Sequence, residues 1–282
     1  MSKTIAITGC STGFGRVTAL HMAGLGWKVF ATVRREADGE SLLSEATERG
    51  SAEHLTPVIC DITDAEQVSA MGRIIAQAAP GLDALLNNAG TAFPAPLELI
   101  PLDALRSQME VNVIGHMSVT QTLLPLLKAA RGTIINVTSI GGRIGLPLIG
   151  AYNASKFAME ALSDVLRFEL APFGVRVVAI EPGTSATAIW ETSGSRANEL
   201  LGERADVEPY IPLIDSVNVY FREDVKNGFP VRLFAETVQK ILDDPRPRTR
   251  YQVPRSVRWT ILLRYLMPDL LWDRMMRKAL KL

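Results

Sequence analysis

The sequence predicts a doubly wound α/β fold, in which a single parallel β-sheet is covered by helices on both faces. Short apolar stretches rich in β-branched residues alternate along the chain with longer amphipathic stretches. This alternation is the order of a parallel sheet with crossover helices. The apolar stretches are also almost continuously hydrophobic, which is typical of strands that are buried on both faces.

The alternation covers the chain up to residue 180. Strands are expected at 4–8, 28–33, 55–60, 83–87, 132–139 and 174–180, and 250–254 is a candidate for a last strand. Helices are expected between them at 14–26, 41–49, 64–79, 102–130 and 151–172. The segment 184–230 is polar, with scattered aromatic residues and prolines. Because it has no strand pattern, we expect a long functional loop that serves as a substrate lid.

Composition narrows the class of protein. With 47% apolar and 21% charged residues in 282, the chain can bury a large core, and we expect one catalytic domain over residues 1–282. The formal net charge is zero, which argues against nucleic acid as a partner. No window of 18 apolar residues or secretory signal is evident, so no membrane span is expected.

Cysteines and histidines indicate neither disulfides nor a metal site. Cys10 and Cys60 do not suggest a disulfide framework, which fits a reducing compartment, and a cytoplasmic location is expected. His21, His54 and His116 lack metal-ligand spacing.

A glycine-rich loop lies where such folds bind phosphates. TGCSTGFG, residues 8–15, follows the first expected strand and opens the first helix. Backbone N–H groups and the positive end of a helix face the ligand at such a junction. The glycines follow the spacing G-x-x-x-G-x-G (Gly9, Gly13 and Gly15), and the alternative is a turn without a ligand.

The ends of the next two strands offer further contacts. The second strand ends in Arg34 and Arg35 without a carboxylate, which favours the 2′-phosphate of NADP over the 2′-hydroxyl of NAD. The alternative is a solvated pair of surface arginines. Asp61 follows the third strand and could face an adenine, or it could cap the helix that begins near Asp64.

The stretch AYNASKFAMEAL places Tyr152 and Lys156 four residues apart, on one face of an expected helix. A tyrosine has a pKa of about 10, and a nearby cation lowers it toward neutrality. We therefore expect Lys156, together with an oxidised nicotinamide, to make Tyr152 a general acid–base. The alternative is an interface aromatic beside a solvated lysine.

Together these motifs resemble the short-chain dehydrogenases/reductases, a family with a Rossmann-like fold, over about residues 4 to 190. The matching motifs are TGCSTGFG, NNAG at 87–90, Asn112 in VNVIG, Ser139 in NVTSIGG, Y-x-x-x-K at 152–156 and PGTSAT at 182–187. Within the family the chain looks most like the 17β-hydroxysteroid and retinol dehydrogenases.

The resemblance implies roles for individual residues. The catalytic residues would be Asn112, Ser139, Tyr152 and Lys156, with Ser139 polarising the substrate oxygen and Asn112 relaying protons through Lys156 and water. A bent helix is the alternative for Asn112. The residues that bind NADP(H) would be Gly9, Ser11, Gly13, Phe14, Gly15, Arg34, Asp61, Asn88, Ala89, Gly90, Tyr152, Lys156, Pro182, Gly183 and Thr187.

The expected activity is NADP(H)-dependent interconversion of a carbonyl and an alcohol on a lipophilic molecule such as a steroid, retinoid or aliphatic aldehyde. Residues expected to shape its pocket are Phe93, Ile144, Leu146, Ile189, Trp190, Tyr210 and Phe221, with an ordinary lid core as the alternative for the aromatic ones. Rival interpretations are an NAD-preferring dehydrogenase and a non-catalytic NADP(H) sensor.

The C-terminal segment 255–282 is helical in pattern, with a break at Pro268, and carries seven basic and two acidic residues among apolar ones. A basic amphipathic segment can lie on an anionic membrane surface, so peripheral membrane contact is one expectation. The alternative is a pair of helices that covers the substrate cleft or forms the interface of a homo-oligomer.

Overall fold

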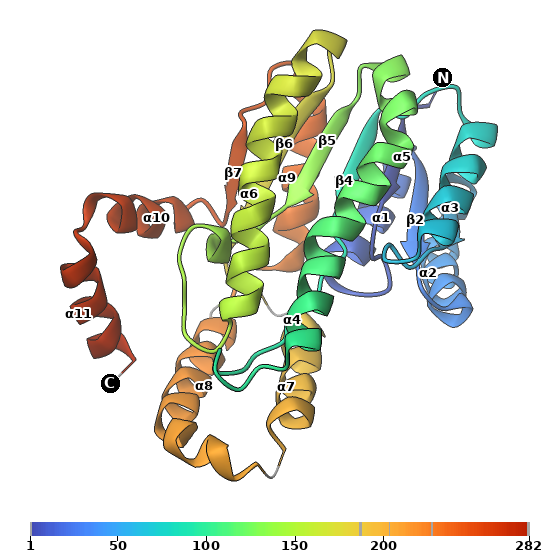
Figure 1. The fold of residues 1–282 in the computed structure, drawn as a ribbon. Coiled ribbons are helices and arrows are strands. Elements are labelled where there is room, and N and C mark those ends of the chain that lie inside the picture. The colour runs from blue at the N-terminus through green and yellow to red at the C-terminus, as the bar shows by residue number, and fades with distance from the viewer. Residues whose placement is uncertain (1, 186–187, 203, 227, 281–282) are drawn as a thin grey trace.

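A computed structural model describes residues 2–185, 188–202, 204–226 and 228–280, with the backbone alone at 188–192 and 224. In this part of the chain seven parallel strands form one sheet in the order β3-β2-β1-β4-β5-β6-β7 (Figure 1). The strands are β1 (Thr4–Ile7), β2 (Lys28–Val33), β3 (Leu55–Ile59), β4 (Ala84–Asn87), β5 (Thr133–Val137), β6 (Arg176–Pro182) and β7 (Arg250–Val253).

Helices cover both faces of the sheet, as the sequence predicts (Figure 1). One layer holds α1 (Gly13–Gly24), α2 (Glu36–Glu48) and α9 (Val231–Asp243), and the other holds α3 (Ala65–Ala78), α5 (Gly115–Ala130) and α6 (Gly150–Leu170). Because side chains alternate along a strand, Ile5 and Ile7 pack toward α1 while Ala6 packs toward α3. The chain is therefore a doubly wound α/β fold.

The strand order reverses at β1. Ile5 pairs with Val29 of β2 on one side and with Ala84 of β4 on the other. The connections from β1 and β4 consequently leave the sheet toward opposite faces. A crevice opens between them at the carboxyl ends of the strands, which is where such sheets bind ligands.

Two local expectations were wrong in detail. The second helix begins at Glu36 rather than residue 41, because the acidic residues Glu36 and Asp38 suit the positive end of a helix. The edge strand β3 is not buried on both faces, since Thr56 and Ile59 are exposed. β3 lies at the edge of the described sheet, with a neighbouring strand on one side alone.

The segment 184–230 is largely helical, so the expectation of a long loop was wrong. It contains α7 (Ala188–Leu201), a short 3₁₀ stretch (Ala205–Tyr210) and α8 (Ile211–Lys226). Pro212 lies in the first turn of α8, where its missing N–H breaks no helical hydrogen bond. Pro212 therefore marks the start of a helix and not a loop.

The C-terminal segment forms two helices, α10 (Val257–Leu266) and α11 (Asp269–Ala279), which extend away from the sheet beyond β7 (Figure 1). The N-terminal end of α10 packs on the turn after β6, since a Cβ on Gly183 would lie 2.8 Å from Val257 Cγ2. The Ser216 hydroxyl of α8 donates a hydrogen bond to the Leu280 carbonyl just beyond α11. Among the described helices, none is both long and apolar enough to cross a bilayer.

Candidate active site

A cleft of about 560 Å³ lies at the carboxyl edge of the sheet and gathers most of the residues singled out in the sequence. Gly15 and Asn112 lie behind its lining, and Thr187 falls outside the described residues. The predicted residues that line the cleft are Gly9, Ser11, Gly13, Phe14, Arg34, Asp61, Asn88, Ala89, Gly90, Ser139, Tyr152, Lys156, Pro182 and Gly183.

The glycine loop needs its glycines because the backbone is crowded and partly left-handed. Gly9 and Gly13 have φ angles of 71° and 59°, which favour glycine. A Cβ on Gly15 would lie 2.2 Å from the Gly9 carbonyl oxygen and 2.5 Å from Asn88 Nδ2. The first turn of α1 can approach the strand end this closely only with glycine at position 15.

The loop is locked to the NNAG segment after β4. The Thr8 hydroxyl oxygen accepts hydrogen bonds from the backbone N–H groups of Asn88 (2.9 Å) and Ala89 (3.0 Å). Asn88 Nδ2 donates to the carbonyls of Thr8 (2.8 Å) and Gly9 (3.1 Å). The Asn88 amide therefore holds the loop in shape, and its expected contact with the adenosine ribose stays a prediction.

The start of α1 is shaped to accept an anion. Thr12, at the N-terminal boundary of the helix, makes no capping hydrogen bond, so no capping side chain takes up its first N–H groups. The Phe14 ring points into the core, where it stacks on Phe234 at 4.3 Å and Phe229 at 5.6 Å between ring centroids. Phe14 therefore packs the start of α1 against the core. The glycine loop and the N-terminal end of α1, here called the cradle, fit a dinucleotide pyrophosphate.

The two arginines after β2 differ in their surroundings. Arg35 is paired with Asp38, whose carboxylate oxygens lie 2.8 and 2.9 Å from its nitrogens, and its side chain is 78% exposed. Arg34 lines the cleft. Only Arg34 is thus placed to meet a ligand.

Asp61 does not cap α3, which decides one alternative left open by the sequence. Asp64 is the cap, because its carboxylate accepts hydrogen bonds from the N–H groups of Glu66 (2.9 Å) and Gln67 (3.1 Å). Asp61 instead accepts from the backbone and hydroxyl of Thr63 at 3.0 and 2.8 Å. Its position in the cleft lining leaves the adenine contact as a prediction.

Asn112 lies in a π-helical turn (Glu110–Ile114) between α4 (Leu102–Met109) and α5, where one continuous helix was expected. Its side-chain oxygen accepts from the Thr91 N–H (2.9 Å), and its Nδ2 donates to the Thr91 carbonyl (3.1 Å) and to Ser155 Oγ (3.0 Å). The widened turn thus ties the chain after NNAG to α6. Its role in a proton relay stays a prediction.

Ser139, Tyr152 and Lys156 meet at the middle of the cleft. Ser139 follows β5, and Tyr152 and Lys156 lie on the first two turns of α6, where Lys156 Nζ is 5.6 Å from the centre of the Tyr152 ring. Lys156 Nζ donates to the Val137 carbonyl at 2.8 Å. All three side chains are buried, which excludes the interpretation of an interface aromatic beside a solvated lysine.

Burial dominates the electrostatics of this group. Desolvation raises the pKa of Tyr152 above its ordinary value, and a hydrogen bond with Ser139 opposes that rise. Desolvation also lowers the pKa of Lys156 to about 8, against the charge of Glu160. In the protein alone burial therefore sets the direction of the Tyr152 pKa shift, and the expected lowering of that pKa by Lys156 together with an oxidised nicotinamide stays a prediction.

Comparison with known proteins assigns the family. The short chain dehydrogenase family profile matches residues 3–198. The chain belongs to the short-chain dehydrogenase family. It is therefore an oxidoreductase, and the fold and motifs of this family serve a nicotinamide dinucleotide.

Relatives of this family align along almost the whole chain. Human retinol dehydrogenase 16 is 34% identical, over 97% of this chain and 87% of its own. An NADPH-dependent 3-dehydrocapnine reductase from Ornithobacterium rhinotracheale is 32% identical, over 98% and 96%. A solved short-chain dehydrogenase/reductase from Burkholderia phymatum in complex with NAD has the same fold, with a TM-score of 0.81 at 23% identity, over 94% and 93%.

His116 is a buried neighbour of Lys156 that the sequence did not single out as part of the site. Its Nε2 lies 2.7 Å from the Ala89 carbonyl, so Nε2 carries the proton. Burial and the Lys156 charge lower the pKa of His116 to about 3, which keeps it neutral.

Among the described residues, no group of three or more His, Cys, Asp and Glu side chains is arranged to hold a metal.

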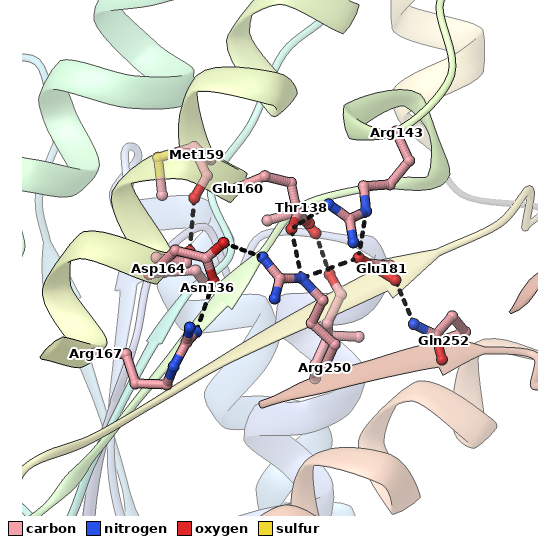
Figure 2. Close-up of polar contacts among 12 residues, drawn as sticks. Asn136, Thr138, Arg143, Met159, Glu160, Asp164, Arg167, Glu181, Arg250 and Gln252 are labelled. Carbon is pink, nitrogen blue, oxygen red and sulfur yellow. Dashed lines mark hydrogen bonds and ion pairs between the residues drawn. The ribbon is translucent and has the colours of Figure 1, made fainter. Parts of the chain in front are cut away.

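A partly buried ion cluster joins α6 to β6 and β7 (Figure 2). Glu160, one turn after Lys156, pairs with Arg250 at 2.9 Å, and Arg250 also reaches Asp164 at 2.7 Å. Glu181 at the end of β6 faces Arg143 at 3.1 Å. These bonds fix the helix of Tyr152 and Lys156 against the strand ends, and no sequence spacing signals them.

The substrate end of the cleft is partly apolar. Phe93, Leu146 and Phe221 line it as predicted, whereas Ile144 is buried behind the lining. Tyr210 points elsewhere, since its hydroxyl bonds to Glu98, and the side chains of Ile189 and Trp190 lie outside the described residues. Sequence reasoning missed four lining residues that come from the helices after β6, namely Arg196, Tyr220, Val257 and Thr260.

The crowding at Gly15 predicts a selective effect of adding one methyl group. Gly15→Ala should destabilise the fold by about 1–3 kcal/mol, because the new Cβ meets backbone, and should weaken NADP⁺ binding by about tenfold or more. Chemical denaturation and calorimetric titration measure the two effects. Gly24→Ala on the same helix is the control, since its Cβ would meet nothing within 4 Å. Equal behaviour of both variants would contradict the proposed cradle.

Proposed function

We propose that this chain is an NADP(H)-dependent oxidoreductase that interconverts a carbonyl and an alcohol on a lipophilic small molecule. One observation carries the proposal: a single cleft joins a phosphate cradle and Arg34 at one end to the buried group Ser139, Tyr152 and Lys156 at the other. Retention of all these groups in one cleft favours turnover over a purely sensory role.

The chain's own residues supply the proton and the polarisation. When bound, the dinucleotide supplies the hydride acceptor or donor. In reduction, the Tyr152 hydroxyl donates a proton to the substrate oxygen, and Ser139 donates a hydrogen bond to the same oxygen. In oxidation the deprotonated Tyr152 accepts the proton of the substrate alcohol, and Ser139 again donates a hydrogen bond to that oxygen. The raised pKa of Tyr152 suits the protonated state from which reduction starts.

Lys156 and the residues around it keep Tyr152 in position and supply charge. Lys156 is held by the Val137 carbonyl and supported by the negative charge of Glu160. Asn112 reaches the tyrosine backbone through Ser155, whose hydroxyl donates to the Tyr152 carbonyl at 2.7 Å. These contacts hold the first two turns of α6, which carry Tyr152 and Lys156, and so restrict the angle between the phenol and an approaching carbonyl.

Two features support a lipophilic substrate. Phe93, Leu146, Ile149 and Phe221 give the substrate end an apolar wall. A relative of similar length is named for retinol, a hydrophobic alcohol. We include steroids, retinoids and aliphatic aldehydes in the candidate class.

The preference for NADP(H) rests on Arg34, which lines the cleft where no carboxylate follows β2 directly. Arg34→Ala should remove a charge-assisted phosphate contact worth about 1.5–3 kcal/mol, which is about one to two decades in NADPH affinity. NADH affinity should change little. Fluorescence titration of both cofactors measures this.

Arg35→Ala is the matched control, because it removes the same charge one residue away from an exposed, paired side chain. It should leave both affinities nearly unchanged. A native protein that prefers NADH, or an Arg34→Ala variant that weakens both cofactors equally, would overturn the assignment.

The proton-transfer role of Tyr152 predicts a loss of turnover with little change in packing. Tyr152→Phe keeps the ring and removes the hydroxyl, so kcat should fall by about 10²–10⁴-fold while NADPH binding survives. A panel of steroid, retinoid and aliphatic carbonyls, followed by absorbance of the reduced nicotinamide, provides the assay. Tyr210→Phe, outside the cleft, is the control.

Lys156→Met tests the charge on the same group. Oxidation needs Tyr152 deprotonated, and loss of the neighbouring cation raises its pKa, so the acid limb of the oxidation profile should move to higher pH.

Near-native turnover by Tyr152→Phe would refute the mechanism. Tight NADPH binding by a native protein that reduces nothing in the panel would instead favour a sensor.

We also propose that α10 and α11 form a peripheral contact with anionic membranes. Trp259, Leu262, Leu266, Leu270 and Leu271 are exposed large apolar residues on these helices, among mostly basic neighbours. Because Val257 and Thr260 line the cleft, α10 also serves as its wall. Both alternatives for this segment, membrane surface and cleft cover, are thus compatible.

Leu266→Ser with Leu270→Ser should reduce co-sedimentation with anionic vesicles by about tenfold or more, because each leucine loses apolar surface that a bilayer would bury. The two side chains are 74% and 75% exposed, so folding should be spared. Leu97→Ser with Leu102→Ser, both 64% exposed and outside the tail, is the control. If the tail variant changes only self-association in gel filtration, the face belongs to an oligomer interface instead.

A further inference from the structure

A second arginine projects into the cleft from α7. The Arg196 side chain lines the same cleft as Arg34, and its Nη1 donates to the Thr91 hydroxyl. Its guanidinium carbon lies 5.1 Å from the centre of the Phe93 ring. Thr91 directly follows the NNAG segment that is locked to the glycine loop, so this guanidinium lies beside the dinucleotide cradle.

The surroundings of Arg196 disfavour its positive charge unless an anionic ligand is bound beside it. Among the described residues, no carboxylate forms an ion pair with it, and its hydrogen bond to Thr91 goes to a neutral hydroxyl. Partial burial and the Arg34 charge both lower its pKa, with only Glu199 opposing them. A guanidinium has five N–H donors, so most of its donors remain for a ligand.

The hydrogen-bond donors around Arg196 indicate which kind of anion would bind there. A guanidinium presents a planar fork of donors that matches phosphate oxygens, and two such forks border the same cleft as the glycine loop. A phosphate is therefore the anion that fits best between these elements.

We propose that Arg196 of α7 binds a phosphate group of the dinucleotide, as a second cationic contact beside Arg34. This inference rests on the proposed function, because it requires a dinucleotide in the cleft. The phosphate is either the pyrophosphate or the 2′-phosphate. In both cases α7, which belongs to the segment that shapes the substrate end, takes part in cofactor binding.

Calorimetric titration of Arg196→Ala with NADP⁺, NAD⁺, adenosine 2′,5′-bisphosphate and adenosine tests the proposal. NADP⁺ affinity should fall by about tenfold, which is the lower end of the range for a charge-assisted contact. The lower end is expected because Arg196 already has a hydrogen-bond partner, Thr91, in the protein without a ligand. If the pyrophosphate is bound, NAD⁺ affinity falls equally. If the 2′-phosphate is bound, the bisphosphate weakens and NAD⁺ does not.

The salt dependence separates a phosphate contact from a structural role. Loss of an ionic contact should flatten the dependence of the NADP⁺ Kd on ionic strength, which loosening of α7 would not do. Arg196→Lys should recover part of the affinity, since it restores the charge without the planar fork. Arg222→Ala on α8, which removes an exposed arginine outside the cleft, should match the native protein.

The outcomes separate this inference from the proposed function. If the native protein binds neither dinucleotide, the proposed function fails, and the inference fails with it. If the native protein binds NADP⁺ and Arg196→Ala matches it within twofold, only the inference is overturned. Equal weakening toward adenosine and the phosphorylated ligands, with an unchanged salt dependence, would also overturn it and assign Arg196 to packing on Phe93.

Discussion

The close approach of the glycine loop to the NNAG segment is the constraint on which the cleft depends. Asn88 donates hydrogen bonds to the hydroxyl and carbonyl oxygens of Thr8 across the point where the strand order reverses, which joins the ends of β1 and β4. The start of α1 can then lie against the strand end because Gly15 has no side chain. The other loops at the carboxyl edge of the sheet complete the cleft around this junction.

Burial shifts the pKa values of Tyr152 and Lys156 more than the interactions with neighbouring charges do. Desolvation raises the pKa of Tyr152 and lowers that of Lys156, so both groups are driven toward their neutral forms. The negative charge of Glu160 limits this effect on Lys156, and the ion pair of Glu160 with Arg250 holds its helix against β7. A cation brought in by an oxidised cofactor would therefore act on a tyrosine that is screened little by water, where charges interact strongly.

Part of the cleft wall is separated along the chain from the residues expected to carry out the chemistry. The groups expected to bind cofactor and move the proton come from the ends of β1 through β6 and the start of α6. Part of the outer wall comes from α7, α8 and α10, all after β6, whereas Phe93, Leu146 and Ile149 precede β6. Arg196 links the two parts, because it lies on α7 and yet contacts Thr91 beside the cofactor segment. Changes in the late helices can thus alter specificity while leaving the sheet edge intact.

The sequence by itself determined the sheet, its covering helices and the motifs at the strand ends. Strand periodicity and glycine spacing are local properties, so they can be read from neighbouring residues. Sequence reasoning missed Arg196, the π-helical turn at Asn112, the helices in 184–230 and the ion cluster of Glu160, Glu181 and Arg250. Those features depend on contacts between residues far apart in the chain, and the balance between desolvation and charge at Tyr152 likewise exists only once the tertiary structure has excluded water.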